Sequence, residues 1–290
     1  MVVAVKALAC ELPYETGLPL SRFSTSDIKR EVLRRGIVAN IGETTLWRWL
    51  SEDAIRPWTY RSWIFPRDPA FAEKAGRILD LYESRWHRKP LSQNDFVISA
   101  DEKPSIQARR RKHPTTPPAP GQPMRVEHEY TREGAWTYFA AWDVHRARVF
   151  GCCVPKSGIA PFDRFVGEVM NQEPYRSARR VFWILDNGSI HRGKRCIERF
   201  RQQWPNATVV HTPIHASWLN QVEIYFSVVQ RKVLTPNDFS ALGEIPHRIA
   251  EFENYYQEIA RPFQWKFTRK DLNRLLKRLA KHESHLKHAA

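Results

Sequence analysis

Two apolar runs, each ending in an aspartate, constrain this sequence more than any other feature. Phe96–Ala100 runs directly into Asp101, and Val181–Leu185 runs directly into Asp186. A continuous apolar run of this length is typical of a strand that is buried on both faces. Open α/β sheets bind their ligands at the carboxyl ends of such strands. A single aspartate there is more often a turn-former, but two in one sheet indicate a shared site.

Strand patterns and helix patterns alternate along the same part of the chain. An antiparallel start is followed by strands that each lead into a helix, which predicts an α/β fold with a mixed sheet and helices on its faces. The expected strands are 96–100, 136–142, 148–154, 181–185 and 208–210, and the expected helices are 162–170, 194–204 and 218–232.

A third acid, Glu223, lies in the last of these expected helices, which Ser217 can cap. Glu223 follows the apolar Val222 by about 100° around the helix axis, so it borders the buried stripe. Asn220 is three residues earlier on the same face. If this helix packs on the sheet edge, Glu223 approaches the two aspartates, whereas taken alone it would be a surface charge.

Three carboxylates within a few ångströms of one another need a cation. Two like charges about 4 Å apart repel by about 4 kcal/mol at an effective dielectric constant of 20. All-oxygen ligands favour Mg²⁺ or Mn²⁺ over zinc, and a pair of such ions serves in-line phosphoryl transfer. Asp101, Asp186 and Glu223 therefore predict a nuclease-type site that holds two divalent ions.

The overall charge suits such a role. The chain has 46 Lys and Arg residues against 31 Asp and Glu residues, a formal net charge of +15, and a surplus of this size attracts polyanions such as nucleic acid. The sequence contains no apolar stretch of about 18 residues, as a transmembrane helix requires. Its four cysteines form no CxxC pair, which suits a reducing cytosol and offers no zinc site.

Residues 20–65 are basic and helical in pattern. A helix that ends at Gly36 and a second short helix over 44–50 are joined by a tight turn, which indicates a helix-turn-helix. The alternative is a small packing unit in which Trp47 and Trp49 are simply core. In the first interpretation, the side chains that face DNA are Thr44, Thr45 and Arg48.

Four adjacent cations followed by five prolines interrupt the region between the first apolar run and the expected hairpin. Like charges repel and prolines prevent regular structure, so an extended loop is expected here. The loop is either a solvated segment or an arm that lies on a phosphate backbone or on a partner subunit, and its position after the first aspartate favours the arm. The four cations are Arg109, Arg110, Arg111 and Lys112.

Three further polar residues compete for a role at the sheet edge. His191 is placed to contact phosphate, although a structural histidine is the more common outcome. Glu102 follows Asp101 directly, and strand alternation points it to the other face. Asp143 lies near the expected hairpin turn, where a salt bridge to a nearby arginine is favoured.

Three short blocks resemble the catalytic blocks of insertion-sequence transposases of the Tc/mariner superfamily, in its bacterial branch. The blocks are Ser99–Glu102, Leu185–His191 and Ser217–Glu223. The second and third acids are separated by 36 residues, 187 to 222, close to the short spacing of that group. The resemblance covers about residues 95–232, and the three blocks together are specific although no single one is.

This resemblance implies a ribonuclease-H-like fold, two Mg²⁺ or Mn²⁺ ions, cleavage of double-stranded DNA at transposon ends and strand transfer into target DNA. Action on two ends makes a homodimer the expected assembly, in the cytoplasm with the nucleoid. The implied metal ligands are Asp101, Asp186 and Glu223, and the supporting residues are Asn187, His191 and Asn220.

The resemblance also predicts how the chain is organised. Family members commonly carry two helix-turn-helix units, and only the second is recognised here, so the chain is expected to begin in the linker after the first. The expected regions are a helix-turn-helix region over 1–65, a helical connector over 66–92, a catalytic domain over 93–235 and a helical segment with a basic tail over 236–290. The alternative functions are a DNA-binding regulator or remnant that no longer catalyses and a nuclease for RNA–DNA hybrids.

Overall fold

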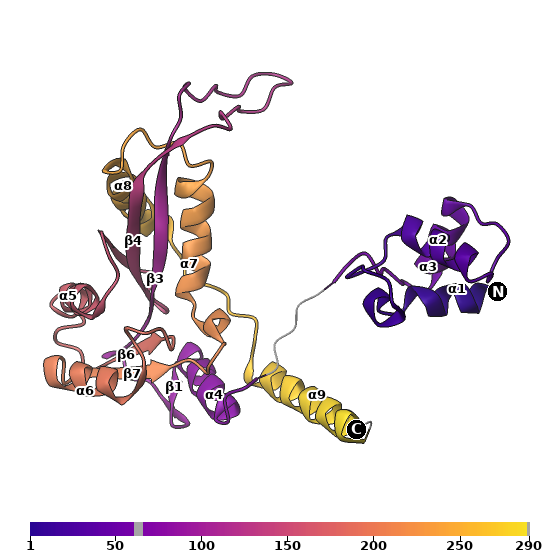
Figure 1. The fold of residues 1–290 in the computed structure, drawn as a ribbon. Helices are drawn as coiled ribbons and strands as arrows, with labels where there is room; N and C mark the ends of the chain where they lie inside the picture. The colour runs from indigo at the N-terminus through magenta and orange to yellow at the C-terminus, as the bar shows by residue number, and fades with distance from the viewer. Residues whose placement is uncertain (61–65, 289–290) are drawn as a thin grey trace. The chain divides into compact units, whose positions relative to one another are not determined.

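The computed structural model describes residues 1–60 and 66–288, with side chains up to residue 281. The chain divides into two compact units, Met1–Ile64 and Phe65–Ala290, each with its own core (Figure 1). The boundary expected at residue 65 lies outside the described residues.

The N-terminal unit is built from three helices around one small core. The Ser24 hydroxyl accepts the backbone N–H of Asp27 at 3.2 Å, and the Asp27 carboxylate accepts the N–H of Ser24 at 3.0 Å, which closes a capping box at the start of the second helix. Trp47 is 57% exposed, so the interpretation that placed it in the core is wrong. The elements are α1 (Val2–Ala9), the 3₁₀ turn η1 (Pro13–Thr16), α2 (Thr25–Arg34) and α3 (Glu43–Glu52).

A five-stranded mixed sheet organises the second unit, in the order β5-β4-β3-β6-β7. β4 runs antiparallel to both β3 and β5, whereas β6 and β7 run parallel to β3, so the sheet is mixed as the sequence pattern predicts. The strands are β3 (Asp95–Arg110), β4 (Thr131–Asp143), β5 (Val149–Val154), β6 (Arg180–Leu185) and β7 (Ala207–His211), and a separate two-stranded hairpin is formed by β1 (Arg85–Trp86) and β2 (Lys89–Pro90).

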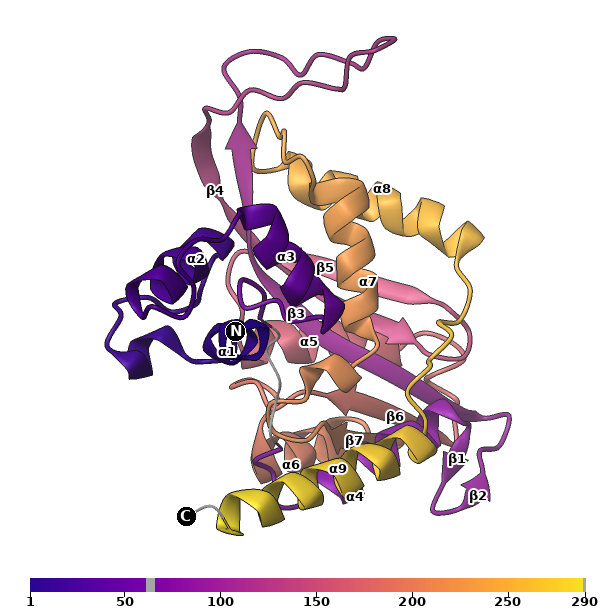
Figure 2. The ribbon, with the colours of Figure 1, turned by 90° about the vertical axis from the view of Figure 1, so that its right-hand side faces the viewer.

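Helices cover both faces of this sheet. Alternate residues of β6 enter different cores: Trp183 packs with α5 and α6, and Ile184 packs with α4, α7 and α8. Figure 2 shows α7 and α8 on one side of the strands and α5 on the other. The helices are α4 (Phe71–Tyr82), α5 (Ile159–Met170), α6 (Gly193–Gln203), α7 (Val222–Val229) and α8 (Glu244–Ile259).

The helices at the two ends of this unit pack on each other. The Arg269 guanidinium of α9 (Arg269–His288) donates to the Asp80 carboxylate of α4 at 2.8 Å. In α4, Ile78 and Leu79 are buried in the same core as α7, so α4 is packed on the sheet. None of the described helices is long and apolar enough to span a membrane.

The first long strand extends further than its apolar run predicts. β3 continues through Pro104 to Arg110, because the bulge between Lys103 and Ile106 lets the strand resume its pairing with β4. Arg109 and Arg110 therefore lie in a strand, and the expectation that they belong to a loop is wrong. We call residues 111–130 the arm; it extends beyond the ends of β3 and β4 (Figure 1).

The helix that carries the third acid begins later than expected. A 3₁₀ turn, η2 (Ser217–Leu219), is followed by Asn220 in an extended conformation, and α7 begins at Val222. Asn220 therefore lies outside the helix, and the prediction that it shares a helix face with Glu223 is wrong. A π-helical segment, η3 (Gln230–Leu234), continues α7.

Candidate active site

The two aspartates at the strand ends lie side by side. β3 and β6 are parallel neighbours in which Ser99 pairs with Ile184, so Asp101 and Asp186 are in the same register two positions further along. One oxygen from each carboxylate and one ring nitrogen of His191 all lie within 4.8 Å of one another. The structure thus brings together two of the three acids that the sequence singled out.

His191 is completely buried between these acids. Its Nε2 atom is 2.7 Å from Glu102 Oε2, 3.8 Å from Asp101 Oδ1 and 3.9 Å from Asp186 Oδ1. Because an ionised carboxylate only accepts hydrogen bonds, we assign the proton of the His191 ring to Nε2, which then donates to Glu102. The ring edge packs on Phe162, with centroids 4.4 Å apart. His191 is therefore a buried donor inside the acid cluster.

Glu102 lies on the opposite face of β3 from Asp101, as strand alternation predicts: Phe139, its partner on β4, belongs to the core under α5 and α6, whereas Ala140, opposite Asp101, belongs to the core under α7. His191 packs on Phe162 of that same core, and its Nε2 atom at the end of the strands lies between Glu102 and the two aspartates. The Glu102 backbone N–H also donates to Asp101 Oδ1 at 2.8 Å. The Glu102 carboxylate is thus joined to the site through His191 and not through the ligand group of Asp101 and Asp186.

Asp186 is held by the turn that follows its strand. Its Oδ1 atom accepts the backbone N–H of Gly188 at 2.7 Å, and the Asn187 side chain donates to the carbonyl of Thr212, directly after β7, at 2.6 Å. A Cβ atom at position 188 would lie 2.9 Å from Asp186 Oδ1, so glycine is needed for this close approach.

Asn220 connects the third sequence block to the first. Its side-chain amide donates to the carbonyl of Ala100 at 3.0 Å and to Asp101 Oδ2 at 3.4 Å, and its oxygen accepts the hydroxyl of Ser99. The Ser99 hydroxyl in turn accepts the backbone N–H of Val222 at 2.8 Å. Asn220 is fully buried, and its bonds hold one oxygen of Asp101 in place.

Glu223 lies in the first turn of α7 and is half-buried. Within the described residues, it does not belong to the tight group of ligand atoms formed by Asp101, Asp186 and His191. Burial raises the pKa of Glu223, Lys103 opposes this, and the charge of Asp186 raises it further. The charge of Glu223 therefore interacts with those of Asp101 and Asp186, although its side chain makes no hydrogen bond to them.

The acids destabilise one another's charges. Burial raises the pKa of Asp101 well above its ordinary value, and the charges of Asp186, Glu102 and Glu223 raise it further, against a hydrogen bond from the Glu102 backbone. A divalent cation removes this repulsion, and carboxylate oxygens are the donors that Mg²⁺ and Mn²⁺ prefer. The residues present therefore fit a hard divalent ion.

Asp143, the competing fourth acid, has a structural role. It is almost completely buried, and its oxygens accept the backbone N–H groups of His145 and Arg146 and the hydroxyl of Tyr175 at 2.8 Å. The expected salt bridge to an arginine is not among the ion pairs of the described residues. Asp143 forms the turn between β4 and β5.

The residues predicted to contact DNA lie in two places. On α3, Thr44 and Arg48 are exposed and Thr45 is partly buried. At the start of the arm, the guanidinium groups of Arg109 and Arg111 lie over the ring of Tyr130, 4.6 and 5.0 Å from its centroid. Arg110 pairs with Glu133 at 3.0 Å, and Lys112 is exposed.

The comparisons with known proteins agree with this fold. The family profile described as DDE superfamily endonuclease matches residues 97–245, half of the chain, and this segment contains all three acids. The chain belongs to the DDE superfamily endonucleases. No protein of curated function matches the sequence.

Several solved structures share the architecture. The Mos1 transposase paired-end complex with left transposon end is 12% identical, with a TM-score of 0.52 over 97% of this chain and 77% of that chain. The Mos1 strand transfer complex is 14% identical, with a TM-score of 0.54 over 97% and 76%. The mariner Mos1 paired end complex with Mg is 12% identical, with a TM-score of 0.51 over 97% and 77%. At these identities the likeness shows the fold, which is the ribonuclease-H-like mixed sheet that the sequence predicts.

Proposed function

We propose that this chain is a transposase of the Tc/mariner type, from the bacterial insertion-sequence branch. It cuts double-stranded DNA at transposon ends and transfers the freed 3′ end into target DNA. The observation that carries this proposal is the convergence of Asp101 and Asp186 at one sheet edge in a member of the DDE endonucleases. The likeness to Mos1 complexes that contain a transposon end supports the choice of substrate.

Two Mg²⁺ or Mn²⁺ ions are the proposed cofactors. Asp101, Asp186 and Glu223 would hold them, and the mutual repulsion of these acids is the feature that favours cations here. A similar Mos1 complex is described with Mg, which supports this assignment. When bound, such ions activate the attacking oxygen and stabilise the leaving oxygen of phosphoryl transfer.

Hydrogen bonds within the chain fix the orientation of the carboxylates before any ion binds. Asn220 fixes Asp101, and the backbone N–H of Gly188 fixes Asp186. His191 holds Glu102 by a hydrogen bond, so this acid stays close to the other two. Because these partners are themselves buried or part of a tight turn, little rearrangement is needed when the site is loaded.

The N-terminal unit supplies the proposed DNA-binding helix. α3 presents Thr44 and Arg48 to solvent, beside the exposed Trp47, on a helix whose opposite side is core. This is the surface that a helix-turn-helix places in a major groove. We expect the exposed Lys112 on the arm to contact a phosphate. Because the protein acts on two transposon ends, a homodimer is the expected assembly. The protein would work in the cytoplasm, on the nucleoid.

The test is metal-dependent cleavage of a labelled duplex that contains the DNA flanking the gene. Wild-type protein is expected to nick and join this DNA with Mg²⁺ or Mn²⁺, and Asp186→Asn is expected to lower the rate at least about 100-fold without lowering the thermal midpoint. Glu198→Gln, an exposed acid of α6, is the matched control and should retain full activity.

Cleavage that survives Asp186→Asn contradicts the proposal. DNA affinity without cleavage, unaffected by metal and by Asp101→Ala, would instead identify a non-catalytic regulator. Faster cleavage of RNA–DNA hybrids than of duplex DNA would identify a hybrid nuclease.

A further inference from the structure

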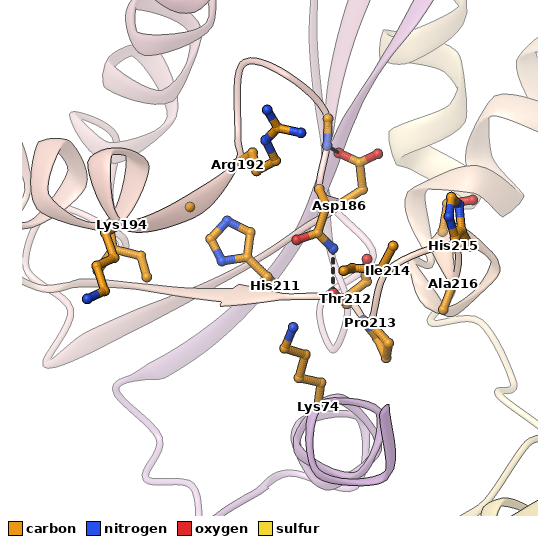
Figure 3. A pocket seen from close by; sticks show the side chains of 15 residues that line it. Lys74, Asp186, Arg192, Lys194, His211, Thr212, Pro213, Ile214, His215 and Ala216 are labelled. Carbon is orange, nitrogen blue, oxygen red and sulfur yellow. Dashed lines mark hydrogen bonds between the residues drawn. The ribbon is translucent and has the colours of Figure 1, made fainter. Parts of the chain in front are cut away.

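A cavity of about 890 Å³ lies beside Asp186, where the loops after β6 and β7 face the start of α6. Figure 3 shows Lys74, Arg192 and Lys194 on different sides of this cavity, with the ring of His211 between them. Asp186 lines the cavity and also belongs to the acid cluster, so the cavity opens directly onto the candidate active site. Resting on the proposed function, we propose that this cavity binds an unpaired segment of the DNA strand whose phosphate is cut.

The charges around the cavity favour a polyanion. Three cationic side chains line it, and among the described residues Asp186 is the one acid in the lining. Arg192 and Lys194 are exposed, with no ion pair or hydrogen bond from their side chains to any other described residue. Lys74 is held at 2.8 Å from the buried carboxylate of Asp68.

The side of the cavity formed by Lys74, Ile214 and His211 is held in place by hydrogen bonds. Asp68, which anchors Lys74, also accepts the backbone N–H of Ile214 at 2.9 Å, so one buried acid positions both a cation and a piece of the apolar wall. The ring of His211 is fixed by a hydrogen bond from Nε2 to the carbonyl of His191 at 2.6 Å. These hydrogen bonds therefore hold the lining of the cavity in one arrangement in the folded unit.

The placement of Arg192 and Lys194 works against the helix that carries them. They flank the first residue of α6, whose first turn contains no acid, although the positive end of the helix dipole disfavours cations there. A bound phosphate would relieve this repulsion. Arg192 and Lys194 thus lower the stability of α6 when the cavity is empty, and a bound anion would offset this cost.

Apolar groups complete the cavity and distinguish its ligand from a simple anion. Ile197 is 36% exposed and Ile214 is 43% exposed, and both line the cavity together with Pro213. Rings such as that of His211 stack on the faces of unpaired bases, the apolar side chains beside it extend this surface, and the neighbouring cations bind the backbone. A phosphodiester strand with its bases exposed satisfies both parts of the lining.

The size of the cavity excludes a double helix. A space of 890 Å³ corresponds to a cube with an edge of about 10 Å, which is less than the width of the major groove alone, about 12 Å. A strand that enters the cavity must leave its partner strand. The duplex therefore has to open next to the phosphate that Asp101 and Asp186 face.

Binding to a short single-stranded oligonucleotide tests this inference. Fluorescence anisotropy with a labelled six-nucleotide strand, the full chain and EDTA measures affinity without cleavage. The double variant Arg192→Ala/Lys194→Ala is expected to bind at least 10-fold more weakly. Its salt slope should fall by about 1.4, because each phosphate contact to a single strand contributes about 0.7.

Matched controls separate the cavity from general basic charge. Arg195→Ala/Arg201→Ala removes the same charge from exposed positions of α6 outside the cavity and should change the affinity less than two-fold. Ile214→Asp should weaken binding of the single strand while leaving blunt duplex affinity unchanged. Competition should come from unlabelled oligonucleotide and not from inorganic phosphate at equal phosphate concentration.

Equal losses in the two double variants, or no loss in either, would overturn the inference. Because these measurements need no metal and no cleavage, they are independent of the proposed reaction. Cleavage that depends on Asp186 together with cavity-independent strand binding would leave the function standing and remove only this inference.

Discussion

The hydroxyl of Ser99 accepts the backbone N–H of Val222 at 2.8 Å, across 123 positions of the chain. Ser99 lies two residues before Asp101 on β3, and Val222 is the first residue of α7, directly before Glu223. A buried strand side chain thus caps the helix that carries the third acid. This hydrogen bond fixes the first turn of α7, and with it the backbone of Glu223, relative to the strand that carries Asp101.

Ser99→Ala tests this link. The substitution leaves the buried N–H of Val222 and the side-chain oxygen of Asn220 without their partner, so the free energy of unfolding should fall by about 1–3 kcal/mol. Urea denaturation measures the change. Ser105→Ala, at an exposed position of the same strand, is the control and should stay within about 0.5 kcal/mol of wild type. Equal effects of the two substitutions would show that Ser99 is not the cap.

Asn220→Ala should impair the use of metal more than folding. Without the amide, Asp101 loses a partner that orients it, and partners of metal ligands typically contribute about 10–100-fold to metal affinity or activity. We expect the Mg²⁺ concentration for half-maximal cleavage to rise by about this factor. Asn206→Ala also loses two hydrogen bonds to backbone carbonyls, but far from the acids, and should leave the Mg²⁺ dependence unchanged. A similar shift in both variants would contradict the role of Asn220.

Glu253 on α8 predicts a specific dependence of stability on pH. Its burial raises its pKa from 4.5 to about 7, although the hydrogen bond from the Tyr138 hydroxyl lowers it. Between these values the unfolded chain loses the proton first, so stability falls as the pH rises from 4.5 to 7 and stays lower above it. The difference between 4.5 and 7 corresponds to about 3 kcal/mol at about 1.4 kcal/mol per pH unit.

Glu253→Gln keeps the acceptor for Tyr138 and removes the titration. Urea denaturation at pH 5, 6 and 8 should show the variant gaining on wild type as the pH rises, with a clear advantage at pH 8. A constant difference between the two proteins across this range would mean that Glu253 does not titrate in this window.

Arg48→Ala should weaken binding of duplex DNA. A side chain that reads a base edge contributes about 1–3 kcal/mol of discrimination, so its loss should relax sequence preference as well as affinity. Gel-shift titration at fixed salt, with specific and scrambled duplexes, separates the two effects. Arg30→Ala on α2, whose guanidinium pairs with Asp27, serves as the control. Equal effects on both duplexes would make Arg48 a phosphate contact only.

The sheet and the place of the two aspartates could be predicted from sequence because they follow from local pattern. An apolar run such as Val181–Leu185 leaves no polar face, so the strand must be covered on both sides, and its end marks the edge where Asp186 lies. The hairpin with its turn near Asp143 follows from two apolar segments, 136–142 and 148–154, separated by a short turn segment.

The remaining features depend on contacts between distant residues. The start of α7 is set by Ser99, and no property of residues 217–223 alone shows that Asn220 turns out of the helix to reach Asp101. Strand alternation places Glu102 on the other face from Asp101, and only the folded position of His191, 89 residues away, brings this acid into contact with the site. The length of β3 depends on its partner β4, which continues to pair beyond Pro104.

A crystal structure of the full chain grown with Mn²⁺ and a DNA end tests the central claim most directly, because Mn²⁺ is located by its anomalous scattering. The account predicts one ion bound by Asp101 and Asp186 and a second that Glu223 helps to hold. Manganese density elsewhere, with none between Asp101 and Asp186, would contradict it.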